Sequence, residues 1–123
     1  MLSVAIIDSS AQNVVLLSRI LTNFGIPDIV SASDGAEGLR LIINEEPHMA
    51  LVNVDLPTIT GYSLAYSLSL EAELDVILVA LTDYKPSLIK DEARNIGFAE
   101  VMGFAHAHTE LLNILGKYHG ASA

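Results

Sequence analysis

The chain has 123 residues, 51% of them hydrophobic, which predicts a single domain with a sizeable core and leaves no room for a second domain. Fifteen acidic against six scattered basic residues give a net charge of −9, which disfavours direct nucleic-acid binding because phosphate contacts need clustered lysine and arginine. The chain has no cysteine, no basic flank of a signal peptide and no apolar run long enough to cross a bilayer, so disulfides are excluded and we expect a cytoplasmic protein without membrane association.

Short apolar runs alternate with segments in which apolar side chains recur at helical spacing. The apolar runs predict strands at residues 2–7, 29–32, 49–54, 76–81 and 100–104. The helical patterns predict helices at residues 14–24, 35–44, 62–70, 86–96 and 109–118. Gly25 and Gly97 follow two of these helices and Pro86 lies in the first turn of another, as is typical of helix ends and starts.

These elements form five consecutive strand–helix units. Strands that are apolar on both faces and are separated by helices indicate a parallel sheet covered on both sides, which is the doubly wound α/β class. Right-handed crossovers leave few topologies for such a sheet. We expect residues 1–119 to form one domain, with residues 120–123 as a short tail.

In an open sheet of this class, ligands bind beyond the carboxyl ends of the strands. The residues at these ends are Asp8, Ser9, Asn53, Thr82 and Phe104. Position 53 is where a reactive side chain would project from the tip of the third strand. The residue there is an amide, which is a poor nucleophile, so we expect no catalytic residue and no enzyme activity.

Four segments make the chain resemble the response-regulator receiver domain over nearly its whole length: residues 4–8, 32–35, 53–57 with Gly61, and 80–82. The resemblance implies the flavodoxin-like fold of CheY-like receivers, a five-stranded parallel sheet of strand order 2-1-3-4-5 with five helices. It also implies two-component signal transduction, in which an aspartate at the third strand tip accepts a phosphoryl group from a histidine kinase. In such proteins two acids hold Mg²⁺, and a hydroxyl and a lysine contact the phosphoryl oxygens.

This chain keeps only part of that pattern. Asp8 stands at the first acid and Thr82 at the hydroxyl, whereas Ser9 takes the place of the second acid. Asn53 replaces the phosphoacceptor and Phe104 replaces the lysine, so the five positions form a degenerate phosphorylation pocket. Phosphoryl transfer needs an anionic attacker and cations that neutralise the developing charge. A carboxamide cannot form a stable acyl phosphate, and Asn53 is therefore not competent as a phosphoacceptor.

The same substitutions predict weak or absent Mg²⁺ binding, and hence no cofactor. Mg²⁺ prefers hard oxygens, often from one or two carboxylates, and Asp8 is joined here only by a serine and an amide. Asp8 and Asp55 remain as weak metal candidates. Phe104 removes the charge of the lysine and can fill its space. We further predict that the Asn53 amide donates a hydrogen bond to Asp8.

The resemblance also implies a surface for protein partners on the fourth predicted helix, the fifth strand and the fifth helix. The candidate residues there are Lys90, Arg94, Val101, Gly103 and Glu110. Val101 also stands where the family has its switch aromatic residue. The implied partners are a histidine kinase, an output domain or a second copy in a homodimer. We therefore expect a pseudo-receiver that acts through protein–protein contacts, independently of phosphorylation.

Three other interpretations remain open. The domain could carry a phosphoryl group on a non-standard residue such as Asp55. It could bind a small molecule or an anion, as flavodoxin-like modules do, through the hydroxyls that precede the first helix. Asn53 could also be an engineered change in an active receiver. Because Ser9, Phe104 and Val101 depart from the pattern as well, we do not expect Asn53→Asp alone to restore efficient phosphorylation.

Overall fold

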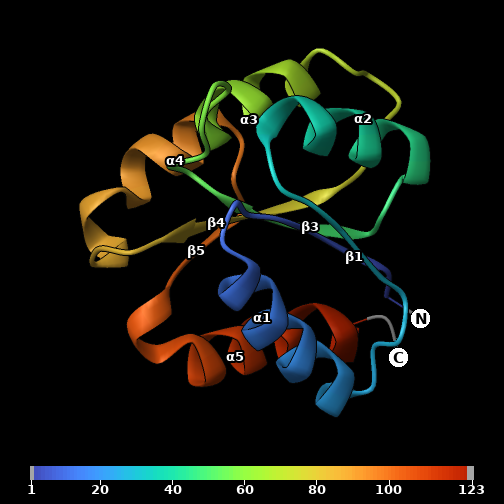
Figure 1. The fold of residues 1–123 in the computed structure, drawn as a ribbon, viewed down its shortest axis with the longest axis vertical. Helices are drawn as coiled ribbons and strands as arrows, with labels where there is room; N and C mark the ends of the chain where they lie inside the picture. Colours follow the sequence, from blue (N-terminus) through green and yellow to red (C-terminus); the bar gives the residue numbers. More distant parts are fainter. Residues whose placement is uncertain (1, 122–123) are drawn as a thin grey trace.

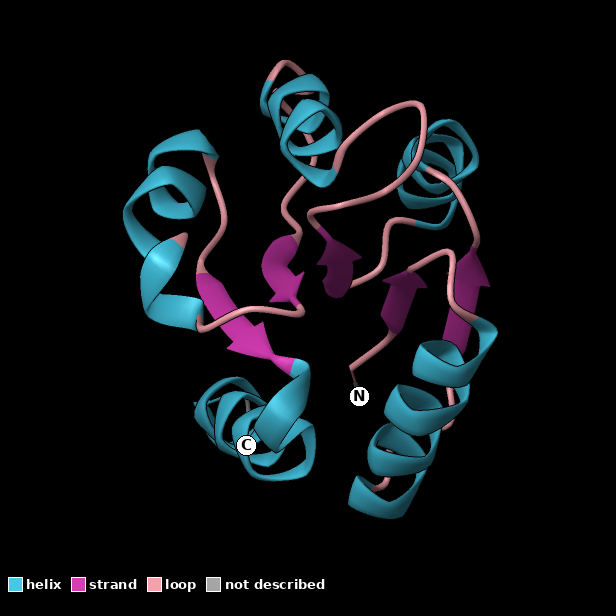
Figure 2. Cartoon of the chain, turned by 60° about the vertical axis from the view of Figure 1, so that its left-hand side comes forward, coloured by secondary structure: helices cyan, strands magenta, loops and turns pink. Residues whose placement is uncertain are grey.

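The computed structural model describes residues 2–121 and shows one sheet between two layers of helices (Figure 1, Figure 2). The strands are β1 (Val4–Ile7), β2 (Ile29–Ala32), β3 (Met49–Asn53), β4 (Ile77–Thr82) and β5 (Glu100–Gly103). The helices are α1 (Ala11–Phe24), α2 (Gly35–Glu45), α3 (Gly61–Ser69), α4 (Lys90–Ile96) and α5 (Ala107–Ala121), with 3-10 turns η1 (Pro86–Leu88) and η2 (Phe104–His106). All strand pairs are parallel and the order is β2-β1-β3-β4-β5, which confirms the predicted fold class and topology.

The sheet is buried on both faces, which explains why its strands are apolar along their length. Helices α1 and α5 pack on one face, and α2, α3 and α4 cover the other (Figure 1). Every residue of β1 and β3 is buried. Because these two strands are parallel neighbours at the centre of the sheet, the residues at their carboxyl ends lie side by side at one edge.

Two element boundaries differ from the sequence prediction. The helix predicted at 86–96 is split into η1 and α4, because the amide of Ile89 donates to the Pro86 carbonyl in a 3-10 turn (3.2 Å) and α4 begins only at Lys90. The fifth strand ends at Gly103, where pairing with β4 stops, and Phe104 begins the turn into α5.

The last helix is longer than predicted. It continues to Ala121 and so includes residues 120 and 121 of the expected tail, while residues 122 and 123 lie outside the described residues. Within residues 2–121, none of the helices combines the length and the apolar character needed to span a membrane.

A polar contact ties the C-terminal half of α5 to the start of β5. The Tyr118 hydroxyl donates to Glu100 Oε2 at 2.7 Å, and Lys117 Nζ contacts the same oxygen at 2.8 Å. Burial, together with the hydrogen bond and the charge of Glu100, raises the pKa of Tyr118 from 10.0 to about 12. Burial opposes ionisation of Glu100, but the hydrogen bonds from Lys117 and Tyr118 and the nearby positive charges outweigh it and lower the pKa of Glu100.

We expect Tyr118→Phe to lower the free energy of unfolding by about 1 kcal/mol at neutral pH, because it removes one hydrogen bond to a carboxylate. The raised pKa of Tyr118 means that its contribution is complete below pH 10 and is lost as the pH rises toward about 12. The lowered pKa of Glu100 means that its contribution is present above its ordinary pKa and is lost as the pH falls through the folded-state value. Urea unfolding should therefore show a difference in the free energy of unfolding between the wild type and Tyr118→Phe at neutral pH, and this difference should shrink above pH 10. A difference that stays the same above pH 10 would contradict the raised pKa of Tyr118.

Candidate functional site

Three buried polar side chains mark the carboxyl edge of the sheet. Asp8 follows β1 and is 2% exposed, Asn53 ends β3 and is 7% exposed, and Thr82 ends β4 and is fully buried. The pairing of β1 with β3 and of β3 with β4 sets these tips beside one another. The fold therefore assembles the central part of the predicted pocket from residues far apart in the sequence.

The Asp8 carboxylate is held by three N–H donors. Its Oδ1 accepts from the backbone amide of Ser10 at 2.9 Å, and its Oδ2 accepts from the side-chain amides of Asn13 at 3.1 Å and Asn53 at 3.2 Å. The predicted hydrogen bond from Asn53 to Asp8 is thus confirmed. Ser10 also caps α1, since its hydroxyl accepts from the Asn13 backbone amide at 3.2 Å.

The Asn53 side chain uses both ends of its amide group. Its Nδ2 donates to Asp8, and its Oδ1 accepts from the backbone amide of Asp55 at 2.8 Å. A carboxylate at this position could accept from Asp55 but could not donate to Asp8. Asn53 therefore links the tip of β1 to the loop between β3 and α3 in a way that an ionised aspartate cannot.

The other predicted pocket residues bring neither a positive charge nor a carboxylate to this edge of the sheet. Thr82 Oγ1 accepts from the backbone amide of Tyr84 at 3.1 Å and so shapes the turn after β4. Ser9 is exposed. Phe104 is partly buried and packs against the apolar core between the sheet and helices α1 and α5, which brings no charge to the edge of the sheet. Val101 is partly buried against the core on the opposite face.

Asp55, the remaining acid of the predicted site, is exposed in the loop after β3. Its charge acts on Tyr62 in α3, whose pKa is raised by burial first and then by the charges of Glu92 and Asp55. Within residues 2–121, no group of three or more histidine, aspartate or glutamate side chains is arranged to hold a metal ion.

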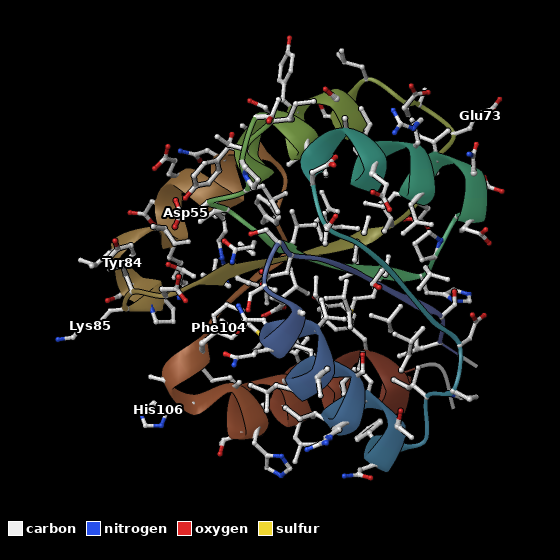
Figure 3. All side chains as sticks on the ribbon, viewed as in Figure 1. Asp55, Glu73, Tyr84, Lys85, Phe104 and His106 are labelled. Carbon is white, nitrogen blue, oxygen red and sulfur yellow. The ribbon has the colours of Figure 1, made fainter. Side chains whose placement is uncertain are left out.

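The predicted partner surface is only partly exposed. Lys90 and Arg94 are exposed on α4, but Gly103 is buried and donates its amide to Glu110 Oε2 at 3.2 Å. Gly103 also lines a groove of about 650 Å³. The other residues that line this groove come from the loop after β4, from η1, from η2 and from the start of α5, and include Tyr84, Lys85, Pro86, Leu88, Ala105 and His106. Figure 3 shows Tyr84, Lys85 and His106 on the same side of the molecule.

Sequence reasoning missed Asn13. The residue lies in the first turn of α1, five positions after Asp8, and its side chain returns to the strand tip. A signal was present, because an amide three residues after a serine cap at a strand-to-helix junction lies on the turn nearest the preceding strand. No spacing rule, however, states which polar group such an amide contacts.

Comparison with known proteins identifies the family. The model of the response regulator receiver domain matches residues 4–104. The chain is 31% identical over 81 residues to the probable transcriptional regulator ycf27 of Porphyridium aerugineum, an alignment that covers 65% of this chain and 33% of that protein.

Two solved structures show the same fold at low sequence identity. The receiver domain of the Francisella response regulator 1452 has a TM-score of 0.87 at 19% identity and covers 100% of both chains. The receiver domain of sensor histidine kinase PA1611 from Pseudomonas aeruginosa PAO1, with a magnesium ion coordinated in its active site cleft, has a TM-score of 0.83 at 19% identity and covers 97% of this chain and 98% of that one.

The chain spans between 26% and 46% of the lengths of the curated relatives that it matches, so the activities of those whole proteins do not carry over to it. The family model, in contrast, extends from β1 to the start of η2. Receiver domains interact with kinases and output domains in two-component signalling. The chain belongs to the family of response regulator receiver domains.

Proposed function

We propose that this chain is a pseudo-receiver, which passes a signal through contacts with protein partners and is not phosphorylated at the tip of β3. The observation that carries the proposal is the neutral amide of Asn53 at that tip, hydrogen-bonded at both ends. The lone pair of an amide nitrogen is delocalised into the carbonyl group, so Asn53 offers no anionic oxygen and no free nitrogen lone pair to attack phosphorus.

The rest of the edge supports the same conclusion. A transferring phosphoryl group needs positive charge around its equatorial oxygens. The lysine position holds Phe104, which packs into the core, and the second acid position holds the exposed Ser9. The Thr82 hydroxyl accepts a hydrogen bond from the Tyr84 backbone amide and so takes part in the turn after β4.

We place the partner contacts on the surface formed by α4, β5 and α5, including the groove above Gly103. Two large hydrophobic side chains of this region are exposed to solvent, Tyr84 by 67% and Leu88 by 71%. Exposed apolar side chains beside a groove are typical of protein contact sites. Lys90 and Arg94 on α4 add positive charge to a chain whose net charge is −9.

The anion-binding alternative has less support. A groove of about 430 Å³ does lie beside the start of α1, and three serine hydroxyls line it. Asp8 and Glu37 line the same groove, and their negative charges oppose an anionic ligand. We therefore do not propose an anion-binding function.

The test is the intact mass of the protein after incubation with a small phosphodonor and Mg²⁺. We expect no phosphoryl adduct, since the Asn53 amide is a poor nucleophile and, in the described part of the chain, the exposed Asp55 forms no salt bridge with a lysine or arginine. An Asp55→Asn variant is the matched control. Any phosphoryl adduct on the wild-type protein would contradict the proposal. An adduct that disappears in the variant would identify Asp55 as a substitute acceptor, and one that persists would lie on another residue.

A further inference from the structure

One similar receiver holds magnesium in its cleft, yet the same edge of this chain is built from hydrogen-bond donors. We propose that the side-chain amides of Asn13 and Asn53 take the place of the divalent cation on Asp8, so that the site is closed to Mg²⁺ and Asn13 is a positioning residue. The inference deepens the proposed function and rests on it, because a pseudo-receiver has no phosphoryl group for a metal to neutralise.

The oxygens of Asp8 are largely occupied by hydrogen-bond donors. A carboxylate offers about four lone-pair sites, and three of them receive N–H donors here. Two of the donors converge on Oδ2, the oxygen nearest the tip of β3. A cation at that oxygen would face the positive ends of two N–H bonds in place of the oxygen ligands that Mg²⁺ requires.

The orientation of the Asn53 amide matters, since a flipped amide would turn its oxygen toward Asp8 and could then bind a cation. Its Oδ1 accepts from the backbone amide of Asp55 at 2.8 Å, and that backbone group can only donate. Rotating the amide by 180° would place two donors against each other and an oxygen against the Asp8 carboxylate. The hydrogen-bond network therefore fixes Nδ2 toward Asp8.

Ser9 and Asp55 do not complete a metal site around Asp8. Ser9, at the position of the second acid, is exposed, and Asp55 lies exposed in the next loop. The described part of the chain places no three acidic or histidine side chains around a common point. Of the acids at this edge, Asp8 is the one that the two amides contact, and three of its lone-pair sites already receive donors.

The hydrogen bonds around Asp8 and Asn53 hold four segments of the chain together. Through Asp8, the amides connect the end of β1, the first turn of α1, the tip of β3 and the loop before α3. Each buried side-chain nitrogen and oxygen atom of the described residues has at least one hydrogen-bond partner, so the network does not need a metal to avoid an unpaired buried polar atom.

Thermal unfolding with and without millimolar Mg²⁺ or Mn²⁺ tests the inference. We expect the wild-type midpoint to be unchanged by either cation. Asn13→Ala should lower the midpoint by about 5 °C, because Asp8 loses one charge-assisted hydrogen bond. The matched control is Asn23→Ala, the same exchange at an exposed site of the same helix, which should not lower it.

A third variant gives a readout that a merely structural role would not produce. Asn13→Asp replaces a donor by a second carboxylate beside Asp8, so its midpoint should rise when Mg²⁺ is added, unlike that of the wild type. A saturable rise for the wild type, or equal midpoints for the two alanine variants, would overturn the inference. A phosphoryl adduct on the wild type would instead overturn the proposed function, so the two failures are distinguishable. If Asn13→Ala does not fold, the wild-type and Asn13→Asp measurements still decide.

Discussion

Asn53→Asp should lower the free energy of unfolding by about 3 kcal/mol in the absence of divalent cations. A carboxylate raises the pKa of a carboxyl group beside it, and a rise of about two pKa units corresponds to about 3 kcal/mol. The Asn53 amide lies 3.2 Å from Asp8 Oδ2, and both residues are buried. The substitution removes the donor and sets two carboxylates against each other. Urea unfolding at neutral pH measures the loss.

The cause can be separated from simple loss of contact. Asn53→Ala also removes the hydrogen bonds to Asp8 and Asp55 but adds no charge. Mg²⁺ should recover stability in Asn53→Asp, where it relieves repulsion between carboxylates, and should leave Asn53→Ala unchanged. If the aspartate variant is as stable as the wild type without cations, the amide bridge is not what holds this edge together.

The same variant addresses signalling. We expect Asn53→Asp to remain poorly phosphorylated by a small phosphodonor, because Phe104 and Ser9 still supply neither the cation nor the second acid. Intact mass after incubation with Mg²⁺ measures the adduct. Rapid, Mg²⁺-dependent labelling would mean that the single amide, and not the whole pocket, blocks the reaction.

Gly61→Ala should be at least as damaging, with an expected loss of about 3 kcal/mol or more. A Cβ at Gly61 would lie 2.5 Å from the Asn53 carbonyl oxygen and 2.7 Å from the Val54 Cα. Both are backbone atoms, so neither can rotate away, and either α3 or the tip of β3 must move. Urea unfolding measures the loss, and a shift of the Asn53 side-chain amide resonances would report the movement of the strand tip.

The matched control is Gly116→Ala in α5. A Cβ there meets nothing within 4 Å, and the residue is exposed within a helix. Alanine should therefore stabilise the protein by up to about 1 kcal/mol through its helix propensity. Equal effects of the two substitutions would show that the close approach of Gly61 to β3 does not restrict the fold.

The class of fold was predictable because its signals are local. Apolar runs such as that of β3 mark strands buried on both faces, and helical spacing between them marks the covering helices. Boundaries were less predictable where backbone turns compete with α-helix, as at Pro86 and Phe104. In a 3-10 turn an amide donates to the carbonyl three residues earlier, and in an α-helix to the carbonyl four residues earlier. Residue patterns do not distinguish these two arrangements.

The candidate site divides in the same way. The sequence by itself determined the identities at the strand tips, and with them that position 53 is an uncharged amide and position 104 carries no positive charge. Only the tertiary structure decided that Asn13 and Asn53 meet on one oxygen of Asp8, and that Asn53 at the same time holds the loop after β3. The reason is that side-chain partners at this edge depend on strand register and helix docking, which join residues 45 positions apart in the chain.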